Sequence, residues 1–318
     1  MQTVTLARHA MATRFELVLH GDDPIALRAA GEEALDEIDR LENQLSLYRP
    51  GSEIAQLNAR AARESVRVTP TLFALLHHAQ QLHAETEGAF DITIAPLVRC
   101  WDFMGGTGKM PTPAEVVEAH ARIGMQHVQL DAPNCAVRFA REGVMLDLGA
   151  IGKGYAVGQA VEFLRETEIT SALVHGGTST VYAIGYPPDR ESWKVAIETP
   201  PGVTVAPDLW PGALSLRDEA MSVSAVWGKF FEADGRRLGH VIDPRTGQPV
   251  NRALLSVVVL PSATETDALS TALLVLGTEG HDSISGLRPG MKTLLVTETN
   301  GTFRVETRGP KYERGLVS

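Results

Sequence analysis

Residues 147–155 read DLGAIGKGY, a glycine-rich segment between a run of strand-forming residues and a helical pattern. Glycines at 149, 152 and 154 allow backbone N–H groups to approach an anion at the N-terminus of that helix. The spacing G-x-x-G-x-G differs from the dinucleotide fingerprint G-x-G-x-x-G, and Lys153 precedes Gly rather than the Ser or Thr of a P-loop. Two interpretations therefore remain open: an anion site, or a strand–helix turn with a solvated Lys153.

Patterns on both sides of this segment predict the other elements. A strand or hairpin is expected up to residue 21, followed by a helix with Asp23 as N-cap and Pro24 in its first turn. Pro70 and Pro113 begin two further helices. The remaining expectations are strands or β-rich runs at 127–130, 136–140, 144–148, 171–177, 180–185, 193–198, 253–260, 293–299 and 303–307, a proline-rich loop at 200–211, and helices near 154–168 and 264–276. Without steady βαβ alternation, this order indicates an α+β fold of mixed sheets and packed helices.

Composition bounds the class of protein. The chain has 318 residues, 44% of them apolar and 21% charged, which is typical of a globular protein. Such a length suits one large domain over residues 1–318, or two closely packed lobes. The 29 Lys and Arg residues against 39 Asp and Glu residues give a net charge of −10. Because nucleic-acid affinity depends on cationic side chains, no nucleic-acid partner is expected.

Targeting signals are also weak. No stretch approaches 18 consecutive apolar residues, so no transmembrane segment is expected, and residues 1–21 lack the apolar core of a signal peptide. Cys100 and Cys135 form no metal-binding spacing. These features favour a cytoplasmic location; the alternative is an exported protein whose leader segment has been removed.

A histidine next to a turn is a candidate base. Residues 240–249 read HVIDPRTGQP, in which Asp-Pro-Arg-Thr-Gly is a turn signature. His240 lies just before it, and histidine titrates near neutral pH, as general-base work requires. The alternative is a hairpin turn beside a structural histidine.

The segment 264–272 carries three oxygen-bearing side chains at helical spacing. Asp267, Ser270 and Thr271 stand at i, i+3 and i+4, which places them on one helix face. One carboxylate with hydroxyls suits Mg²⁺ completed by waters and substrate phosphates. The alternative is a helix cap, because Thr264 followed by Asp267 imitates a capping box.

Two further segments combine an aromatic ring with polar groups. They are TEGAFDITIAPL at 86–97 and LSLYRPGSEI at 45–54, each after an expected helix. Pockets for aromatic ligands often have this composition. By periodicity alone, both are loops and strand starts.

Together, and in this order, the motifs resemble the ApbE-type FAD:protein FMN transferase family over nearly the whole chain. The matching pieces are Met11-Ala12-Thr13, LSLYRPGSEI, EGAFDITIAPL, DLGAIGKGYA, the HGG of 175–177, HVIDPRTGQPV and DALSTALLVLG. Three of the motifs differ from the family pattern. Ala12 stands where Gly is usual, Val223-Ser224-Ala225 replaces a Thr-Ser-Gly, and Thr178 replaces Asn or Asp.

The resemblance implies roles for individual residues. It places the flavin near Met11, Tyr48, Ala89, Phe90 and Asp91. It places Asp147, Lys153 and Ile242 along the rest of the FAD. It assigns the metal to Asp267, Ser270, Thr271 and the backbone carbonyl of Ala150, and the general-base position to His240.

The activity implied by the resemblance is Mg²⁺-dependent transfer of FMN from FAD, the substrate, to a Ser or Thr hydroxyl of an acceptor flavoprotein, with release of AMP. Breaking a pyrophosphate mainly requires positioning and charge neutralisation, which suits this residue set. Two alternatives use the same scaffold: an FAD pyrophosphatase that releases FMN and AMP, and a non-catalytic FAD-binding protein. The presence of both His240 and Asp267 argues against the latter, because binding alone needs no base.

Overall fold

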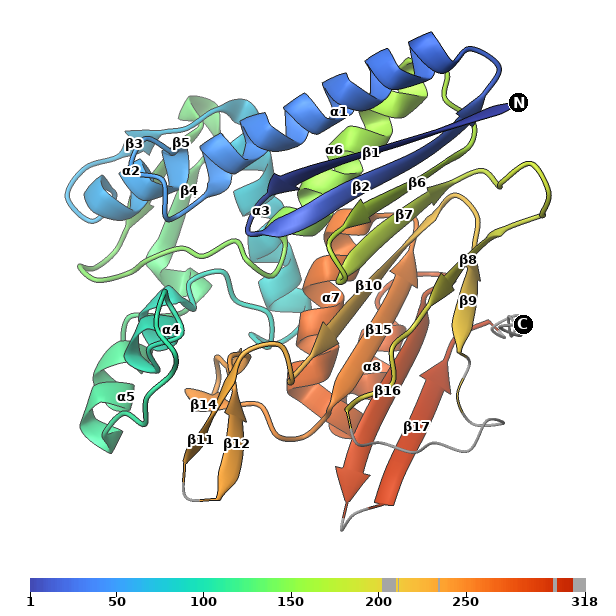
Figure 1. The fold of residues 1–318 in the computed structure, drawn as a ribbon. Coiled ribbons are helices and arrows are strands. Elements are labelled where there is room, and N and C mark those ends of the chain that lie inside the picture. The colour runs from blue at the N-terminus through green and yellow to red at the C-terminus, as the bar shows by residue number, and fades with distance from the viewer. Residues whose placement is uncertain (202–209, 211, 234, 300–301, 311–318) are drawn as a thin grey trace.

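An eight-stranded antiparallel sheet forms the centre of the computed structural model, which describes residues 1–201, 210, 212–233, 235–299 and 302–310 (Figure 1). The strand order is β1-β2-β6-β7-β10-β15-β16-β17. Their bounds are β1 Gln2–Ala10, β2 Thr13–Gly21, β6 Ala172–Gly176, β7 Thr180–Ile184, β10 Glu219–Ala225, β15 Leu255–Leu260, β16 Lys292–Thr299 and β17 Thr302–Arg308. The α+β fold expected from the sequence is confirmed.

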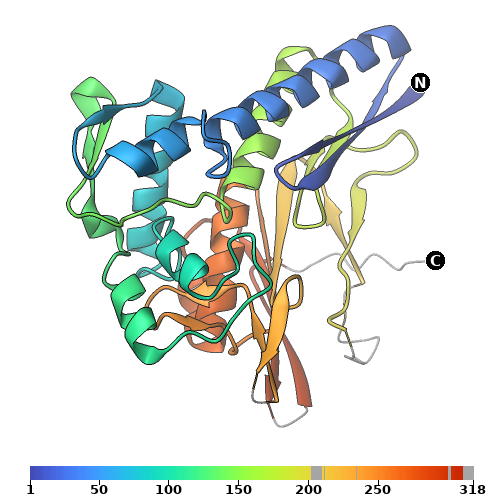
Figure 2. The same ribbon diagram turned by 60° about the vertical axis from the view of Figure 1, so that its left-hand side comes forward.

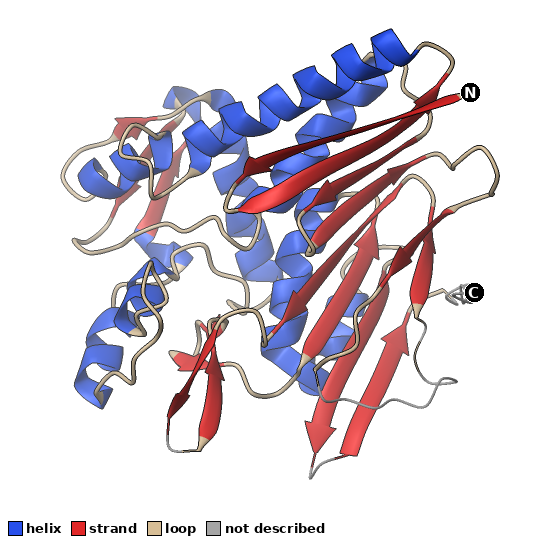
Figure 3. Cartoon of the chain, viewed as in Figure 1, coloured by secondary structure: helices blue, strands red, loops and turns tan. Residues whose placement is uncertain are grey.

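Helices cover one face of this sheet. They are α1 Pro24–Leu45, α6 Gly152–Glu166, α7 Ala263–Leu276 and the short α8 His281–Ser285 (Figure 3). The predicted start of α1 is confirmed: the side chain of Asp23 accepts hydrogen bonds from the N–H groups of Ile25 and Ala26, and Pro24 occupies the first turn. Apolar side chains of these helices pack on β1, β2, β6 and β7 to form the main core.

The opposite face of the sheet is covered by a hairpin. Strands β8 Trp193–Ala196 and β9 Ala213–Leu216 pair with each other and lie against that face. Alternate sheet residues therefore enter different cores: Leu173 packs with Trp193, whereas the adjacent Val174 faces the helices. Because both faces are covered, β15 is buried along its whole length.

A second group of elements lies beside the helix-covered face (Figure 2). It contains α2 Glu53–Arg60, α3 Pro70–Glu85, α4 Ala95–Cys100, α5 Pro113–His120 and the small sheet of β3 Val66–Arg67, β5 Ala136–Phe139 and β4 Val128–Asp131. Two hairpins, β11 Phe230–Ala233 with β12 Arg236–Gly239, and β13 Ile242–Asp243 with β14 Gln248–Pro249, complete it. A satellite core of Leu97, Trp101, Phe103, Val116 and Ile242 joins α4, α5 and these hairpins, whereas α2, α3 and the small sheet pack in the main core.

Two local expectations were wrong. Residues 144–148 are irregular rather than a strand, because both Leu146 backbone groups bond the side chain of Asn58. The segments 86–97 and 45–54 contain turns followed by α4 and α2 respectively, instead of strand starts. Most of the proline-rich loop expected at 200–211 falls outside the described residues. Within the described part of the chain, the structure has no helix long and apolar enough to cross a bilayer.

Candidate functional site

The beginning of α6 and the first turns of α7 meet at Asp267. This buried carboxylate accepts a hydrogen bond from the backbone N–H of Gly154 at 2.9 Å, and its other oxygen lies 4.0 Å from Nζ of Lys153. A Cβ on residue 154 would lie 2.2 Å from the carbonyl oxygen of Ala263, so only glycine permits this approach. The third glycine of the DLGAIGKGY segment therefore serves to join α6 to α7.

The capping alternative for Asp267 is wrong. The N-cap of α7 is Ser262, whose hydroxyl accepts from the N–H of Glu265, and Asp267 lies beyond this first turn. The carboxylate of Asp267 instead accepts from the N–H of Gly154, one of the unpaired donors in the first turn of α6.

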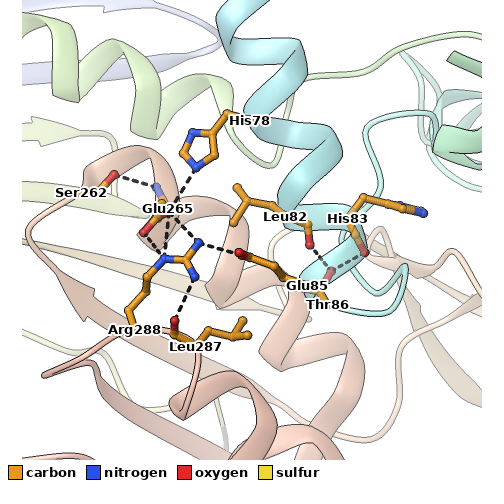
Figure 4. Close-up of polar contacts among 9 residues, drawn as sticks. All are labelled: His78, Leu82, His83, Glu85, Thr86, Ser262, Glu265, Leu287 and Arg288. Carbon is orange, nitrogen blue, oxygen red and sulfur yellow. Dashed lines mark hydrogen bonds and ion pairs between the residues drawn. The ribbon is translucent and has the colours of Figure 1, made fainter. Parts of the chain in front are cut away.

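An ion-pair network fixes the N-terminal end of α7 (Figure 4). Glu265 accepts hydrogen bonds from Nε and Nη2 of Arg288 at 2.9–3.1 Å and lies 3.1 Å from Nε2 of His78 on α3. Arg288 also bonds Glu85 at the end of α3 at 2.7 Å. Burial alone would raise the pKa of Glu265, but the bonds from His78 and Arg288 outweigh it and lower the pKa to about 2. The charges of Glu265, Arg288 and Glu85 thus hold α3 and α7 together.

Hydroxyl groups surround the backbone of Asp267 on its other side. The side chains of Ser270 and Thr271 both lie within hydrogen-bond distance of its carbonyl oxygen, at 3.0 and 3.3 Å. Ser224 of β10 contacts both hydroxyls, at 2.9 and 3.2 Å. Ser270 is fully buried, whereas Thr271 is partly accessible. The structure thus groups the three side chains that the sequence assigned to a metal, and adds Ser224.

The turn before α6 holds Asp147. One of its carboxylate oxygens accepts from the N–H of Gly149 at 2.7 Å, and its own N–H donates to the carbonyl of Ile92 at 2.7 Å. Burial raises the pKa of Asp147, while the bond from Gly149 and the charge of Lys153 act in the opposite direction. Ala150 is half-buried in the same turn, and Nζ of Lys153 donates to the carbonyl of Gly149 at 3.0 Å.

Asp91 lies next to this turn through its neighbour Ile92. Its carboxylate accepts from the N–H and hydroxyl of Thr93, at 2.7 and 2.6 Å, and lies 3.5 Å from Nδ1 of His83. Burial raises the pKa of Asp91, with His83 and Thr93 lowering it in part. Ala89 and Phe90 are each 1% exposed, backbone included, so little of either residue is open to a ligand.

Tyr48 is the accessible aromatic ring in this region. It follows α1 and is 65% exposed, in contrast to Phe90. Partial burial raises the pKa of its hydroxyl, and the nearby carboxylate of Asp147 raises it further. Tyr48 therefore stands beside the Asp147 turn with an open ring face, as a stacking partner requires.

His240 follows β12 and meets the ring of Phe103 edge-on, with centroids 6.4 Å apart. Its Nδ1 lies 3.1 Å from the carbonyl oxygen of Lys229 and 3.4 Å from the N–H of the same residue. The shorter contact, to an oxygen that can only accept, favours the proton on Nδ1, which leaves the Nε2 lone pair as a base. Burial lowers the pKa of His240, and the charges of Lys229 and Lys153 lower it further. At neutral pH the ring is therefore uncharged, the form in which it can accept a proton.

The DPRTG turn fixes the segment after His240. Asp243 is buried and forms a two-pronged ion pair with Arg245, at 2.9 and 2.8 Å, while Gly247 at φ +70° closes the turn. The indole N–H of Trp101 donates to the carbonyl of Gly247 at 2.9 Å. Ile242 is 4% exposed, backbone included, and its side chain packs in the satellite core. The predicted hairpin turn is confirmed.

Met11 lies at the β1–β2 turn, where the Met-Ala-Thr motif contacts the His-Gly-Gly motif. Met11 and Ala12 both have positive φ, 49° and 58°, a conformation that favours the glycine usual at position 12. A Cβ on Gly177 would lie 2.2 Å from Oγ1 of Thr13, so the Met-Ala-Thr and His-Gly-Gly motifs touch. Met11 is half-buried against the main core.

Oxygen atoms dominate the possible metal ligands. Among the residues whose placement is described, no three His, Cys, Asp or Glu side chains gather as a metal-binding group. A cation beside Asp267 would therefore depend on one carboxylate together with hydroxyl and carbonyl oxygens. This hard-oxygen set fits Mg²⁺, which takes few protein ligands and shares substrate phosphates.

Sequence reasoning did not select several residues of this site. They are Ser224 and Ser256 behind α7, Lys229 behind His240, and Glu265 with Arg288 at the α7 N-terminus. The alternation Met221-Ser222-Val223-Ser224 was one available signal, because it places two hydroxyls on one face of a strand.

Comparison with known proteins identifies the family. The model of the ApbE family matches residues 11–295. The chain therefore belongs to the ApbE family.

Characterised relatives share most of the chain. A protein of Treponema pallidum (strain Nichols) named FAD:protein FMN transferase is 34% identical over 285 residues, 85% of this chain and 77% of the relative. One of Klebsiella pneumoniae (strain 342) with the same name is 33% identical over 92% of this chain and 82% of its own. The ApbE protein of Thermotoga maritima superposes with a TM-score of 0.84 at 27% identity, covering 95% and 96% of the two chains. The apo flavinyl transferase ApbE of Pseudomonas stutzeri gives 0.83 at 29% identity, covering 96% and 94%.

Proposed function

We propose that this protein transfers FMN from FAD to a Ser or Thr hydroxyl of an acceptor flavoprotein and releases AMP, with Mg²⁺ as cofactor. The observation that carries the proposal is the junction at Asp267. Its carboxylate meets Gly154 and Lys153, two hydroxyls lie near its carbonyl oxygen, and the charge of Lys153 also lowers the pKa of His240. Relatives named FAD:protein FMN transferase support the same activity.

FAD binds across the segments of the candidate site, with a different part of the molecule at each. The isoalloxazine ring stacks on Tyr48 and lies near Ala89, Phe90 and Asp91, with Met11 at the β1–β2 turn. The pyrophosphate lies against the glycine-rich turn between Asp147 and Lys153, where the ammonium of Lys153 offsets its negative charge. Ile242 lies near the remainder of the FAD.

Mg²⁺ is held by Asp267, Ser270 and Thr271 together with the carbonyl of Ala150. When bound, the ion neutralises charge on the phosphate oxygens during bond cleavage. The donor set supports this assignment because Asp267 is buried and fixed by Gly154, so its carboxylate is already oriented.

His240 provides the base. Its Nε2 accepts the proton of the acceptor hydroxyl as that oxygen bonds to the FMN phosphorus, and the bond from phosphorus to the bridging oxygen of AMP breaks. The carbonyl of Lys229 holds the ring in the required tautomer. Proton transfer of this kind contributes about 10²–10⁴-fold to the rate.

One experiment tests the activity. The purified protein is incubated with FAD and Mg²⁺, with and without an unmodified flavoprotein that offers a Thr attachment site, and AMP is measured by chromatography alongside in-gel flavin fluorescence. Transfer predicts AMP and covalent flavin only when the acceptor is present. AMP with free FMN in its absence would establish hydrolysis, and no AMP in either sample would establish FAD binding without catalysis.

A further inference from the structure

The face of β10 that packs on α7 carries hydroxyls where a helix-covered strand usually carries apolar side chains. Ser222 and Ser224 share this face, whereas Met221 and Val223 enter the core on the opposite side of the sheet. Ser222 is 2.8 Å from the hydroxyl of Thr266 and 3.0 Å from that of Thr180. Ser224 is bonded to Ser270 and Thr271 instead.

Two hydroxyls lie near one carbonyl at this place. The helical N–H of Thr271 already bonds this oxygen within α7, so the hydroxyls compete for its second lone pair. Ser270 and Thr271 each have a single proton, and both lie near the carbonyl oxygen of Asp267, at 3.0 and 3.3 Å. Ser224 relieves the competition because its oxygen can accept from one hydroxyl while its proton is donated to the other. The hydroxyls of Ser224, Ser270 and Thr271 can then form a row of hydrogen bonds in either of two directions, and in each direction every proton has an acceptor.

Burial distinguishes the two directions. In the first, Thr271 donates to Ser224, Ser224 to Ser270, and Ser270 to the carbonyl of Asp267; both lone pairs of Thr271 stay free. In the second, Ser270 donates to Ser224, Ser224 to Thr271, and Thr271 to the carbonyl of Asp267. The free lone pairs then belong to Ser270. Ser270 is 0% exposed and has no access to a ligand, whereas Thr271 is partly accessible. The first direction is the one compatible with a cation beside Asp267.

We infer that Ser224 is a positioning residue for the metal site: it takes the proton of Thr271 and turns the free lone pairs of that hydroxyl toward the cation. This revises the proposed ligand set: Ser270 acts with Ser224 instead of binding the cation directly, which leaves Asp267, Thr271 and the carbonyl of Ala150 as ligands. Ser256 holds Ser270 by donating to its carbonyl at 2.6 Å. This inference depends on the proposed function, because it needs the cation at Asp267.

The test is Mn²⁺ binding, followed by the electron paramagnetic resonance signal of the free ion, with Mg²⁺-dependent FAD cleavage measured in parallel. Ser224→Ala is expected to weaken Mn²⁺ binding by about 10-fold, as loss of a residue behind a metal ligand does, and to raise the Mg²⁺ concentration for half-maximal rate. Ser222→Ala is the matched control, since it removes a hydroxyl from the same strand face without touching Ser270 or Thr271; its Mn²⁺ affinity should stay near wild type. Ser224→Thr keeps the hydroxyl and should retain binding.

The results distinguish a failure of the role assigned to Ser224 from a failure of the proposed metal-dependent function. Wild-type Mn²⁺ affinity in Ser224→Ala would overturn the inference alone, as would equal losses in Ser224→Ala and Ser222→Ala, or an equal loss in Ser224→Thr. If the wild-type protein neither binds Mn²⁺ nor needs Mg²⁺ to cleave FAD, the proposed metal-dependent function fails and the inference fails with it. Melting temperatures of all variants establish that they are folded.

Discussion

The backbone N–H of Gly154 donates a 2.9 Å hydrogen bond to the buried carboxylate of Asp267, 113 residues away in the sequence. This bond orients Asp267 without using a side chain. It requires the two helices to approach so closely that residue 154 has no room for a Cβ.

Gly154→Ala should therefore lower the free energy of unfolding by about 1–3 kcal/mol, since the new methyl group meets the rigid carbonyl of Ala263. Gly158→Ala on the same helix is the control. Its Cβ would lie 3.7 Å from Thr264, an ordinary contact, so the substitution should be neutral or stabilise by about 0.4–1 kcal/mol. Urea unfolding measures both, and equal effects would contradict the close-approach explanation.

Asp267→Asn should keep the fold but lose FAD cleavage. The amide oxygen can still accept from Gly154, so the melting temperature without ligand should remain close to that of wild type. Loss of the negative charge removes the main attraction for Mg²⁺. Differential scanning calorimetry and an AMP assay in saturating Mg²⁺ measure the two effects; full activity with Asn at this position would remove the metal site from the proposal.

The pH dependence of turnover should identify His240 as the base. Its pKa is lowered by burial, so the neutral ring persists to a pH below the ordinary histidine value of about 6.5. Turnover on an acceptor should fall as the pH drops through that lowered pKa. His240→Ala should reduce the rate by about 10²–10⁴-fold, abolish this acid limb and leave FAD affinity nearly unchanged. A variant that modifies the acceptor at the wild-type rate would make His240 structural.

The Glu265 network should make stability depend on pH in the acid range. Because the folded-state pKa of Glu265 is about 2, below its value in the unfolded chain, the ionised network contributes fully above about pH 4.5. That contribution is lost as the pH falls toward 2. Arg288→Ala should destabilise the protein at pH 7 by about 1.5–3 kcal/mol and flatten this acid dependence.

Arg252→Ala provides the comparison, because its ion pair with Glu279 is exposed, at 47% and 82% for the two side chains. An exposed pair contributes less than about 1 kcal/mol. Denaturant unfolding at pH 7 and pH 4 measures both variants, and similar losses would mean that the Glu265 network adds no more than a surface pair.

Tyr48→Ala should weaken FAD binding by about 1–3 kcal/mol, the usual contribution of an aromatic ring stacked on a base. Tyr48→Phe keeps the ring and should bind nearly as wild type. Tyr186→Ala removes another exposed tyrosine, one covered by Arg217, and should leave affinity unchanged. Fluorescence titration of FAD gives the three affinities; an unaltered value for Tyr48→Ala would refute this placement of the flavin.

Local signals in the sequence predicted much of the fold because they act over a few residues. Asp23-Pro24 and Pro113 begin helices where expected, and the alternating runs of 293–299 and 303–307 form β16 and β17. The irregular path of 144–148 could not be predicted in this way. Its backbone is satisfied by Asn58, 88 residues distant from Leu146, and no local pattern reports such a partner.

In the site, too, local sequence patterns predicted some features and missed those that depend on distant residues. Helical spacing placed Asp267, Ser270 and Thr271 together, and the turn signature located the hairpin after His240. The cap of α7 was misjudged because Ser262 lies two residues before Thr264, and both types of residue make good caps. Ser224 contacts α7 through strand pairing and helix packing, which only the folded chain reveals.

The pairing of β2 with β6 has a kinetic consequence. Phe15 lies opposite Gly176, so these adjacent strands close a loop that contains α1 to α6 and the segments bearing Tyr48, Asp91 and Asp147. Closing so long a loop carries a large entropic cost before any contact compensates for it, and folding slows as contacts become more distant in sequence. The hairpins can form early, whereas the glycine-rich turn at 147–154 must meet Asp267 across a separation of 113 residues. Recovery of FAD binding during refolding should therefore be among the last events, which makes the ligand a reporter of the finished fold.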